Sequence, residues 1–277
     1  RRPGPARAGD AGMTVRFGFI GAGGVASWAH LPRLAQLPGV EIAALCDLDE
    51  ARARSLAGRY GGRVYTGYGD MLAREALDCV YVCLPPFARG EAEEAAAAAG
   101  LPLFLEKPVA LDAATARRIG AALQAGGTFA SVGYVFRYLD LVDELRRCLA
   151  GRRVALALGR YFCPPIRNGW WSRRALSGGH TVEQVTHLYD VLRYLLGEAT
   201  CTGAAGYYDI HRDVPDHDVE DATAVHLRFA SGALGSLVYG CTLARGWSSE
   251  IELLGDGFHA RLDFVGRTLR WSDGDTV

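Results

Sequence analysis

The chain has 277 residues, of which 49% are hydrophobic and 22% charged, and its formal net charge is −1. This composition is typical of a globular protein with a sizeable core and room for two domains. It excludes a membrane-spanning helix, because no apolar run approaches the roughly 18 residues required, and it leaves no basic surplus for a nucleic-acid partner. The seven cysteines are widely spaced and form no C-x-x-C pair, so we predict a cytoplasmic protein without a disulfide framework.

The first segment, residues 1–12, begins with two arginines but lacks the apolar stretch of a signal peptide. We expect it to be a flexible leader, with Met13 as the natural start.

From Thr14 onwards, short apolar runs alternate with helical patterns. The predicted strands are Val15–Ile20, Val40–Cys46, Arg63–Tyr65, Cys79–Leu84, Leu103–Leu105 and Phe129–Val132, and the predicted helices are Val25–Leu37, Asp49–Tyr60, Arg89–Ala99 and Ala113–Ala125. Such alternation is typical of right-handed βαβ units. We therefore predict an α/β protein whose residues 13–133 form a dinucleotide-binding Rossmann domain with a doubly wound parallel sheet.

The pattern changes after Gly133. A helix is predicted over 141–150, a strand over 154–162 and a long helix over 180–196. Two hairpins follow, Ala222–Phe229 with Ala233–Tyr239 and Glu250–Leu254 with His259–Phe264. We therefore predict a C-terminal α+β domain with an antiparallel sheet over residues 134–277.

A glycine-rich turn separates the first strand from the first helix: Gly21-Ala22-Gly23-Gly24-Val25-Ala26. It fits the G-x-G-x-x-G/A pattern, in which small residues let main-chain N–H groups approach a pyrophosphate. Asp47 ends the second strand, where a carboxylate can hold a ribose diol, so the pattern predicts NAD as cofactor. NADP stays open, because Arg52 is near enough in sequence to accept a 2′-phosphate.

Glu106-Lys107-Pro108 follows the fifth strand, and Lys107 is the one lysine of the chain. All other basic residues are arginine, which cannot easily lose its proton, so a retained lysine indicates chemistry that an arginine could not perform. Strand ends at this edge of an α/β sheet face the ligand crevice. Glu106 is expected to fix Lys107, and a plain strand-end carboxylate is the alternative.

On the long predicted helix, Glu183, His187 and Asp190 stand at i, i+4 and i+7 and would share one face. A carboxylate one turn from an imidazole can orient it as a general base. The alternative is a solvated polar stripe. His180, Glu183 and His187 match no familiar metal-ligand spacing, so we predict no metal.

Together, the glycine turn, Asp47, Leu84-Pro85-Pro86, Glu106-Lys107-Pro108 and Gly178-Gly179 followed by His187-x-x-Asp190 resemble the Gfo/Idh/MocA oxidoreductases over about residues 14–264. The resemblance implies a Rossmann domain, then an α/β domain whose open sheet often forms the oligomer interface. It implies NAD(H)- or NADP(H)-dependent oxidation of a sugar or cyclitol alcohol, or the reverse reduction, without a metal. Lys107 would be the active-site lysine and His187 the acid/base.

The chain departs from this pattern at several positions. Glu183 stands where many members have aspartate, Val185 replaces a usual glycine, and Arg89 occupies a common histidine position. The chain also ends at Val277, short of typical members, which fits a C-terminally truncated second domain.

Motif and resemblance lead to specific site predictions. The predicted cofactor-binding residues are Gly21, Ala22, Gly23, Gly24, Val25, Asp47, Leu84, Pro85, Glu106, Lys107 and Arg137, the predicted substrate-binding residues are Lys107, Trp170, Trp171 and His187, and the predicted catalytic residues are Lys107, Glu183 and His187. His187 would take the substrate's hydroxyl proton while Lys107 stabilises the alkoxide, and the two are expected to meet beside the nicotinamide.

Trp170, Trp171 and Tyr161 could offer flat faces to a sugar ring or pack in the core, and Arg137 could instead form a surface salt bridge. The expected partners are a sugar or cyclitol substrate and further copies of the chain, not a nucleic acid or a membrane. Two other functions stay open: an NAD-dependent, redox-assisted glycosidase and a non-catalytic dinucleotide sensor.

Overall fold

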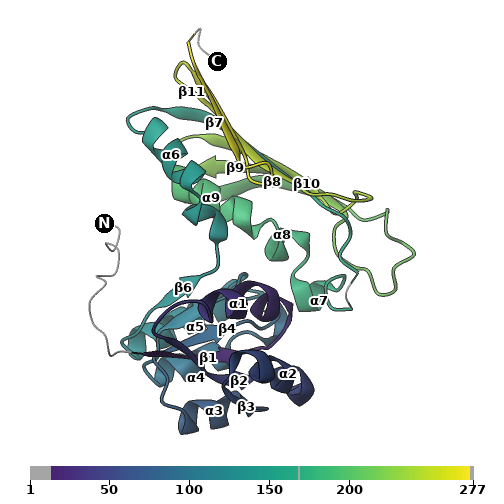
Figure 1. Cartoon of the computed structure of the whole chain (residues 1–277). Coiled ribbons are helices and arrows are strands. Elements are labelled where there is room, and N and C mark those ends of the chain that lie inside the picture. Colours follow the sequence, from purple (N-terminus) through teal and green to yellow (C-terminus); the bar gives the residue numbers. More distant parts are fainter. Residues whose placement is uncertain (1–13, 168, 275–277) are drawn as a thin grey trace. The chain divides into compact units, whose positions relative to one another are not determined.

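The computed structural model describes residues 14–167 and 169–274 (Figure 1). The chain divides into two compact units, the first ending at Gly133 and the second beginning at Tyr134. The predicted leader, residues 1–12, lies outside the described residues.

The first unit contains a six-stranded parallel sheet in the order β3-β2-β1-β4-β5-β6. Its strands are β1 Val15–Ile20, β2 Val40–Cys46, β3 Arg63–Tyr65, β4 Cys79–Val82, β5 Leu103–Leu105 and β6 Ala130–Val132. The order reverses between β1 and β4, which is the place where ligands bind in such sheets. The predicted doubly wound α/β fold is confirmed.

Helices cover both faces of this sheet, since successive side chains of a buried strand point to opposite sides. Phe19 packs into a cluster with Leu31 and Leu56, whereas Ile20 packs into another with Ala96 and Ile119. The helical segments are η1 Ala26–His30, α1 Leu31–Leu34, α2 Glu50–Tyr60, α3 Tyr68–Arg74, η2 Pro86–Ala88, α4 Glu91–Ala98 and α5 Ala113–Ala125.

Local features of the first unit differ from the sequence prediction. The helix predicted over Val25–Leu37 is the π-helical η1 followed by α1, which ends at Leu34. Helix α3 was not predicted, because its seven residues show no clear apolar period. Strand β4 ends at Val82, two residues early, since Pro85 and Pro86 have no N–H to continue a ladder.

The second unit contains a seven-stranded sheet in the order β13-β12-β11-β7-β10-β9-β8. Its strands are β7 Val154–Phe162, β8 Ala199–Tyr207, β9 Ala222–Phe229, β10 Leu234–Gly240, β11 Ser248–Gly255, β12 Phe258–Asp263 and β13 Thr268–Asp273. All neighbours are antiparallel except β7 and β10, which are parallel. The sheet is therefore mixed, which refines the prediction of an antiparallel one.

Helices cover one face of this second sheet, as α6 and α9 show in Figure 1. The helical segments are η3 Val135–Tyr138, α6 Asp140–Cys148, α7 Arg174–Ser177, α8 His180–Glu183 and α9 Thr186–Leu196. Ala157 and Tyr161 of β7 join Leu188 and Leu192 of α9 in the core. Leu158 and Arg160 therefore point to the opposite, outer face, because side chains alternate along a strand.

Strands β8 and β13 and helix α7 were not predicted. Strand β8 is an edge strand whose residues are almost all exposed, so it carries no alternation of apolar and polar side chains to detect.

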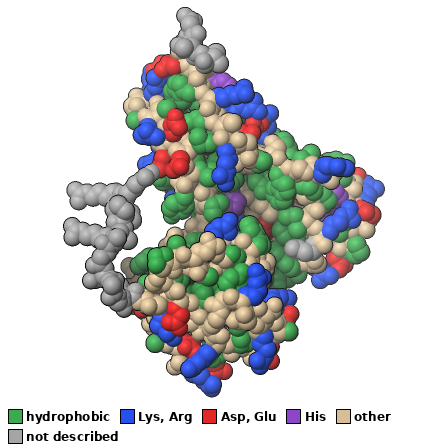
Figure 2. Space-filling model, viewed as in Figure 1, with side chains coloured by type: hydrophobic (Ala, Val, Ile, Leu, Met, Phe, Trp, Pro, Cys, Tyr) green, Lys and Arg blue, Asp and Glu red, His purple; other side chains and the backbone are tan. Residues whose placement is uncertain are grey.

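Over the face in Figure 2, basic side chains are interspersed with acidic ones, in keeping with the net charge of −1. None of the described helices has both the length and the apolar character of a membrane span.

Candidate active site

The candidate residues fall into two groups, one on each unit. In the first unit, the glycine turn leaves the end of β1 and leads directly into the first helix. Gly21 adopts a positive φ of 94°, and a Cβ there would lie 2.6 Å from the carbonyl oxygen of Cys83. A Cβ on Gly23 would meet nothing within 4 Å. Gly21 is thus required by the fold, whereas Gly23 keeps the turn open, which is the cradle that a pyrophosphate needs.

Asp47 lies beside this turn at the end of β2. Its Oδ2 accepts the N–H of Ala22 at 2.8 Å, and its Oδ1 accepts the N–H of Asp49 at 2.9 Å. Arg52 Nη1 lies 3.5 Å from the same Oδ1. The carboxylate is therefore held in place by the main chain, with Arg52 close by. This arrangement fits a ribose diol, and the NADP alternative rests on Arg52.

Directly after the turn, Ala26–His30 form a π-helical turn, in which the N–H of Leu31 returns to the oxygen of Ala26. Such wide turns are frequent at functional sites. His30 packs its ring near Tyr81 and Phe104, and its Nε2 lies 2.6 Å from Oε1 of Glu106. His30 was not among the predicted site residues. The feature of the sequence that could have identified it is its place in the first helical segment after the glycine turn.

Glu106 and Lys107 follow β5 at the carboxyl edge of the same sheet. Glu106 is buried, and its Oε2 accepts the main-chain N–H of Lys107 at 3.1 Å. Lys107 is half-buried, and its peptide bond to Pro108 is cis. Glu106 therefore links the main chain at Lys107 to His30. The ends of β1, β2, β4 and β5 share one edge of this parallel sheet, so Gly21, Asp47, Leu84 and Lys107 gather there.

Two residues beside this edge have other roles. Burial raises the pKa of the Cys83 thiol to about 12, with a further contribution from the charge of Glu106, so Cys83 stays protonated and is a poor nucleophile. Arg89 has a fully buried side chain, which donates to the oxygen of Val82 at 3.2 Å and to Glu93 at 3.3 Å.

In the second unit, His187 lies in the first turn of α9 and is half-buried. Its ring centroid lies 5.0 Å from that of Phe136 and 6.2 Å from that of Tyr134. Thr186 Oγ1 and the Tyr134 hydroxyl are 3.4 Å apart. Segment η3 therefore packs along the imidazole of His187 and restricts its orientation.

The predicted unbroken helix over 180–196 is wrong. Helix α8 ends at Glu183 and α9 begins at Thr186. The N–H of Val185 bonds to the oxygen of His180, and both residues are fully buried. On a regular helix, residues five apart point ~140° away from each other, so the wider turn is needed to bring both into the core.

This break places Glu183 in α8, whereas His187 and Asp190 lie on α9. Glu183 is buried, and its charge adds to the burial that raises the pKa of Tyr161. Asp190 accepts two hydrogen bonds from Arg137, at 2.6 and 2.5 Å, and these raise the pKa of the guanidinium. Arg137 therefore forms an ion pair within the second unit, with a buried carboxylate as its partner.

The predicted aromatic faces divide by burial. Trp171 is 3% exposed and packs against the fully buried ring of His180. Tyr161 is 6% exposed and donates its hydroxyl to Oε1 of Gln184. For these two residues, burial favours the alternative of packing in the core. Trp170 is half-buried, and its role in binding a sugar ring stays a prediction.

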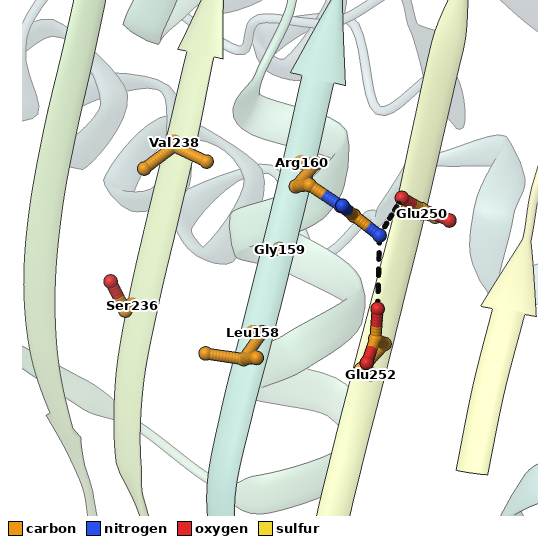
Figure 3. A pocket seen from close by; sticks show the side chains of 7 residues that line it. All are labelled: Leu158, Gly159, Arg160, Ser236, Val238, Glu250 and Glu252. Atoms are coloured by element: carbon orange, nitrogen blue, oxygen red, sulfur yellow. Dashed lines mark hydrogen bonds and ion pairs between the residues drawn. The ribbon is translucent and has the colours of Figure 1, made fainter.

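A pocket of about 250 Å³ lies on the outer face of the second sheet and is lined by residues of β7, β10 and β11 (Figure 3). Figure 3 shows Arg160 between Glu250 and Glu252, with which it forms ion pairs. His187 lies on α9, which covers the opposite face of this sheet. The pocket is therefore separate from His187 and the aromatic residues packed around it.

Comparison with known proteins assigns both units. The family described as an oxidoreductase family with an NAD-binding Rossmann fold matches residues 15–134, and the GFO/IDH/MocA C-terminal domain matches residues 152–259. A protein of Amycolatopsis mediterranei, named as a UDP-kanosamine synthase oxidoreductase subunit, is 30% identical over 265 residues, which are 94% of this chain and 69% of that protein. Inositol 2-dehydrogenase of Rhizobium meliloti is 28% identical over 88% of this chain and 74% of that enzyme.

Solved structures share the fold. The WlbA dehydrogenase of Chromobacterium violaceum, in complex with NADH and UDP-GlcNAcA, superposes with a TM-score of 0.87 at 23% identity and covers 96% of this chain and 79% of that one. KijD10, a 3-ketoreductase of Actinomadura kijaniata solved with NADP, gives a TM-score of 0.83 at 22% identity, covering 95% of this chain and 82% of that one. With both units matched and the glycine turn in place, the chain belongs to the GFO/IDH/MocA oxidoreductase family, and its first unit carries the NAD-binding Rossmann fold.

Proposed function

We propose that this oxidoreductase interconverts a secondary alcohol and a ketone on a sugar or cyclitol ring. The observation that carries the proposal is the edge of the first sheet, where an open glycine turn, the carboxylate of Asp47 and the one lysine of the chain gather at the ends of parallel strands. When bound there, the nicotinamide dinucleotide supplies the hydride acceptor or donor.

In this proposal the turn over 21–25 holds the pyrophosphate, Asp47 the ribose, and Leu84 and Pro85 border the cofactor. We favour NAD over NADP, because the fixed carboxylate of Asp47 suits a diol and repels a 2′-phosphate.

The proton chemistry is assigned to Lys107 and His187. The Lys107 ammonium stabilises the oxygen of the substrate as it gains negative charge, and the His187 imidazole accepts the hydroxyl proton. The proposal requires both groups to act on the same hydroxyl. It assigns Glu183, a buried carboxylate four residues before His187, to help orient the imidazole.

Neighbouring aromatic residues also help to orient His187. Phe136 and Tyr134 restrict the ring through η3, and η3 is in turn fixed by the ion pair between Arg137 and Asp190. Arg137 therefore acts through the position of η3, and contact with the cofactor is not needed to explain it.

The substrate class rests on the relatives. Their names include an inositol dehydrogenase, a UDP-kanosamine synthase subunit and a dehydrogenase solved with a UDP-sugar acid. These names refer to a cyclitol and to nucleotide-linked sugars, whose rings carry secondary alcohols, and one ammonium and one imidazole suit the oxidation of such an alcohol.

We further propose a cytoplasmic homo-oligomer. All seven cysteines lie within the described residues and are free thiols, which supports a reducing compartment. The outer face of the second sheet pairs its own charges, Arg160 with Glu250 and Glu252, and exposes Leu234 and Val238 beside them. Such a self-neutralised, partly apolar face suits contact with a second copy.

A substrate screen tests the proposed function. The purified protein is incubated with NAD⁺ or NADP⁺ and a panel of cyclitols, hexoses and UDP-hexoses, and NADH or NADPH is followed by absorbance. We expect turnover of at least one ring alcohol, faster with NAD⁺. Binding of the dinucleotide without oxidation of any panel member, or in the reverse direction reduction of any matching ketone, would reject the enzymatic proposal in favour of a sensor.

A further inference from the structure

A second cluster of reactive side chains lies far along the chain from Lys107, within the second unit. The long connection over 208–221, between β8 and β9, carries His211, His217 and Asp221. It passes the residue after β10, Cys241. Single ligand atoms of His211, Asp221 and Cys241 all lie within 4.8 Å of one another, and the three residues are buried.

The contacts within the cluster centre on Asp221. Its Oδ1 lies 3.0 Å from Nε2 of His217 and 3.9 Å from Nε2 of His211. Its Oδ2 accepts the N–H of Ile210 at 2.7 Å. The two imidazole rings have centroids 5.5 Å apart. One oxygen of Asp221 is thus fixed by the main chain, and the other faces both histidines.

Burial makes this carboxylate unusual. Asp221 has 0% exposure, and Cys241 has 1%. A carboxylate removed from water needs hydrogen bonds, a positively charged partner or a bound metal ion to stabilise it. No arginine or lysine of the described residues forms an ion pair with Asp221, so its partners are the N–H of Ile210 and the two histidines, and a bound cation would add a compensating charge.

Space for an ion exists beside these groups. A cavity of about 10 Å³ is lined by His211, His217 and Cys241, together with Trp171 and Val214. That volume corresponds to about one water molecule, which is also enough for one small ion. The cavity is therefore too small for an organic ligand.

We propose that His211, Asp221 and Cys241 bind one divalent transition-metal cation, best represented by zinc, as a structural site. Imidazole nitrogen, carboxylate oxygen and thiolate sulfur are the ligands that zinc takes in proteins. Around a tetrahedral zinc ion such ligands stand about 3.5 Å apart, so the group needs to contract by about 1 Å. A water molecule would complete the tetrahedron.

Two adjustments accompany binding. Nε2 of His211 donates to the carbonyl oxygen of Cys241 at 2.8 Å, because a carbonyl can only accept. The cation would replace that proton. His217 is then a positioning residue, whose hydrogen bond to Asp221 orients the carboxylate in the way that outer partners orient metal ligands.

A bound cation would order the long connection over 208–221 and would take no part in the redox chemistry. Residues 208–221 contain no helix or strand, and loops of this length need a reason to be ordered. A cation would tie both ends of the connection to the end of β10. The inference is independent of the proposed dehydrogenase activity, since none of its residues belongs to the two groups of candidate site residues.

Metal binding is tested on the full chain, produced without a polyhistidine tag and stripped with a chelator. Zn²⁺ affinity and stoichiometry are measured by calorimetry, and Co²⁺ is added as a spectroscopic probe. We expect one Zn²⁺ per chain, and a Co²⁺ spectrum with tetrahedral bands and a thiolate-to-cobalt charge-transfer band.

Matched variants identify the ligands. Cys241→Ser and His211→Gln should weaken Zn²⁺ binding by at least about 100-fold, and Cys241→Ser should also remove the charge-transfer band. Cys201→Ser and His226→Gln change an exposed cysteine and an exposed histidine of the same unit and should bind as the wild type does. His217→Gln should weaken binding by about 10- to 100-fold while keeping the charge-transfer band.

A measurement on the wild type covers the case in which Cys241→Ser does not fold. Alkylation of Cys241 and of the equally buried Cys163 is followed by mass spectrometry, with and without Zn²⁺. We expect Zn²⁺ to slow the reaction of Cys241 about tenfold relative to Cys163, because a metal-bound thiolate is protected. Absence of stoichiometric Zn²⁺ binding, equal protection of both thiols, or wild-type binding by Cys241→Ser would overturn the proposal and leave His217 as the side-chain partner of Asp221.

Discussion

Asp47 shows how one side chain can serve both fold and cofactor. Its two carboxylate oxygens accept main-chain N–H groups on either side, from the glycine turn and from the start of the next helix. The carboxylate is therefore oriented before any ligand arrives, and such preorganisation reduces the cost of binding. A change at Asp47 should consequently alter the choice of cofactor more than its mere binding.

We expect Asp47→Asn to weaken NADH binding by about tenfold, because a charged hydrogen bond to the ribose diol is replaced by a neutral one. NADPH binding should change far less, since its 2′-phosphate gains from the lost negative charge. Fluorescence titration with both cofactors measures this. Asp49→Asn, at the neighbouring helix cap, is the control and should leave the ratio unchanged. An equal loss for NADH and NADPH would argue against the ribose role.

The chemistry of Lys107 was visible in the sequence, but its supporting residues were not. A lone lysine after a strand can be recognised from composition and pattern alone. The contact of His30 with Glu106 depends on the π-helical turn that carries His30. The spacing of apolar residues in the sequence does not predict such a turn. Sequence reasoning therefore finds reactive groups more readily than the neighbours that hold them.

At the scale of elements, helix α4 depends on a buried ion pair at its start. Glu93 accepts the N–H of Gly90 at 2.7 Å and pairs with Arg89, and neither charged side chain has any exposure. Removing one partner of a fully buried pair leaves an uncompensated charge, which is far more costly than losing a surface pair.

We therefore expect Glu93→Ala to lower the free energy of unfolding by about 3 kcal/mol or more, as followed by urea denaturation. The adjacent Glu94 pairs with Arg118 at the surface, and Glu94→Ala should cost less than about 1 kcal/mol. Similar losses for both variants would contradict the assigned role of the buried pair.

The break between α8 and α9 marks the limit of element prediction from sequence. Helical pattern over 180–196 is strong, and both pieces are indeed helical. The break arises because His180 and Val185 are both drawn into the core of the second unit. That is a tertiary requirement, and it decides that Glu183 and His187 lie on different helices.

At the scale of the whole molecule, the doubly wound first unit could be predicted almost completely, because each buried parallel strand is a short apolar run closed by a turn signal. The second unit was predicted less well. Its edge strand β8 is solvent-exposed and carries little apolar alternation, so its sequence gives little signal of a strand. The edge strand β13 is only six residues long, with Leu269 and Trp271 as its apolar positions.

The outer face of the second sheet leads to a prediction about assembly. Val238 and Leu234 are 38% and 47% exposed on this face. We expect Val238→Arg to convert a wild-type oligomer into smaller species, because an unpaired charge in an apolar contact is costly. Light scattering after size-exclusion chromatography measures the mass. Leu37→Arg, an exposed apolar position of the first unit, is the control. An unchanged mass for Val238→Arg would exclude this face as the interface.

The central claim is that Lys107 acts on the substrate at the edge of a cofactor-binding sheet. The most direct measurement compares wild type and Lys107→Met in the same preparation, for NADH affinity by fluorescence and for turnover of the ring alcohol found by the screen. The account predicts NADH binding within about twofold of wild type and turnover reduced by at least about 100-fold, since the group that stabilises the alkoxide is gone. Wild-type turnover by Lys107→Met with NADH binding intact would contradict it.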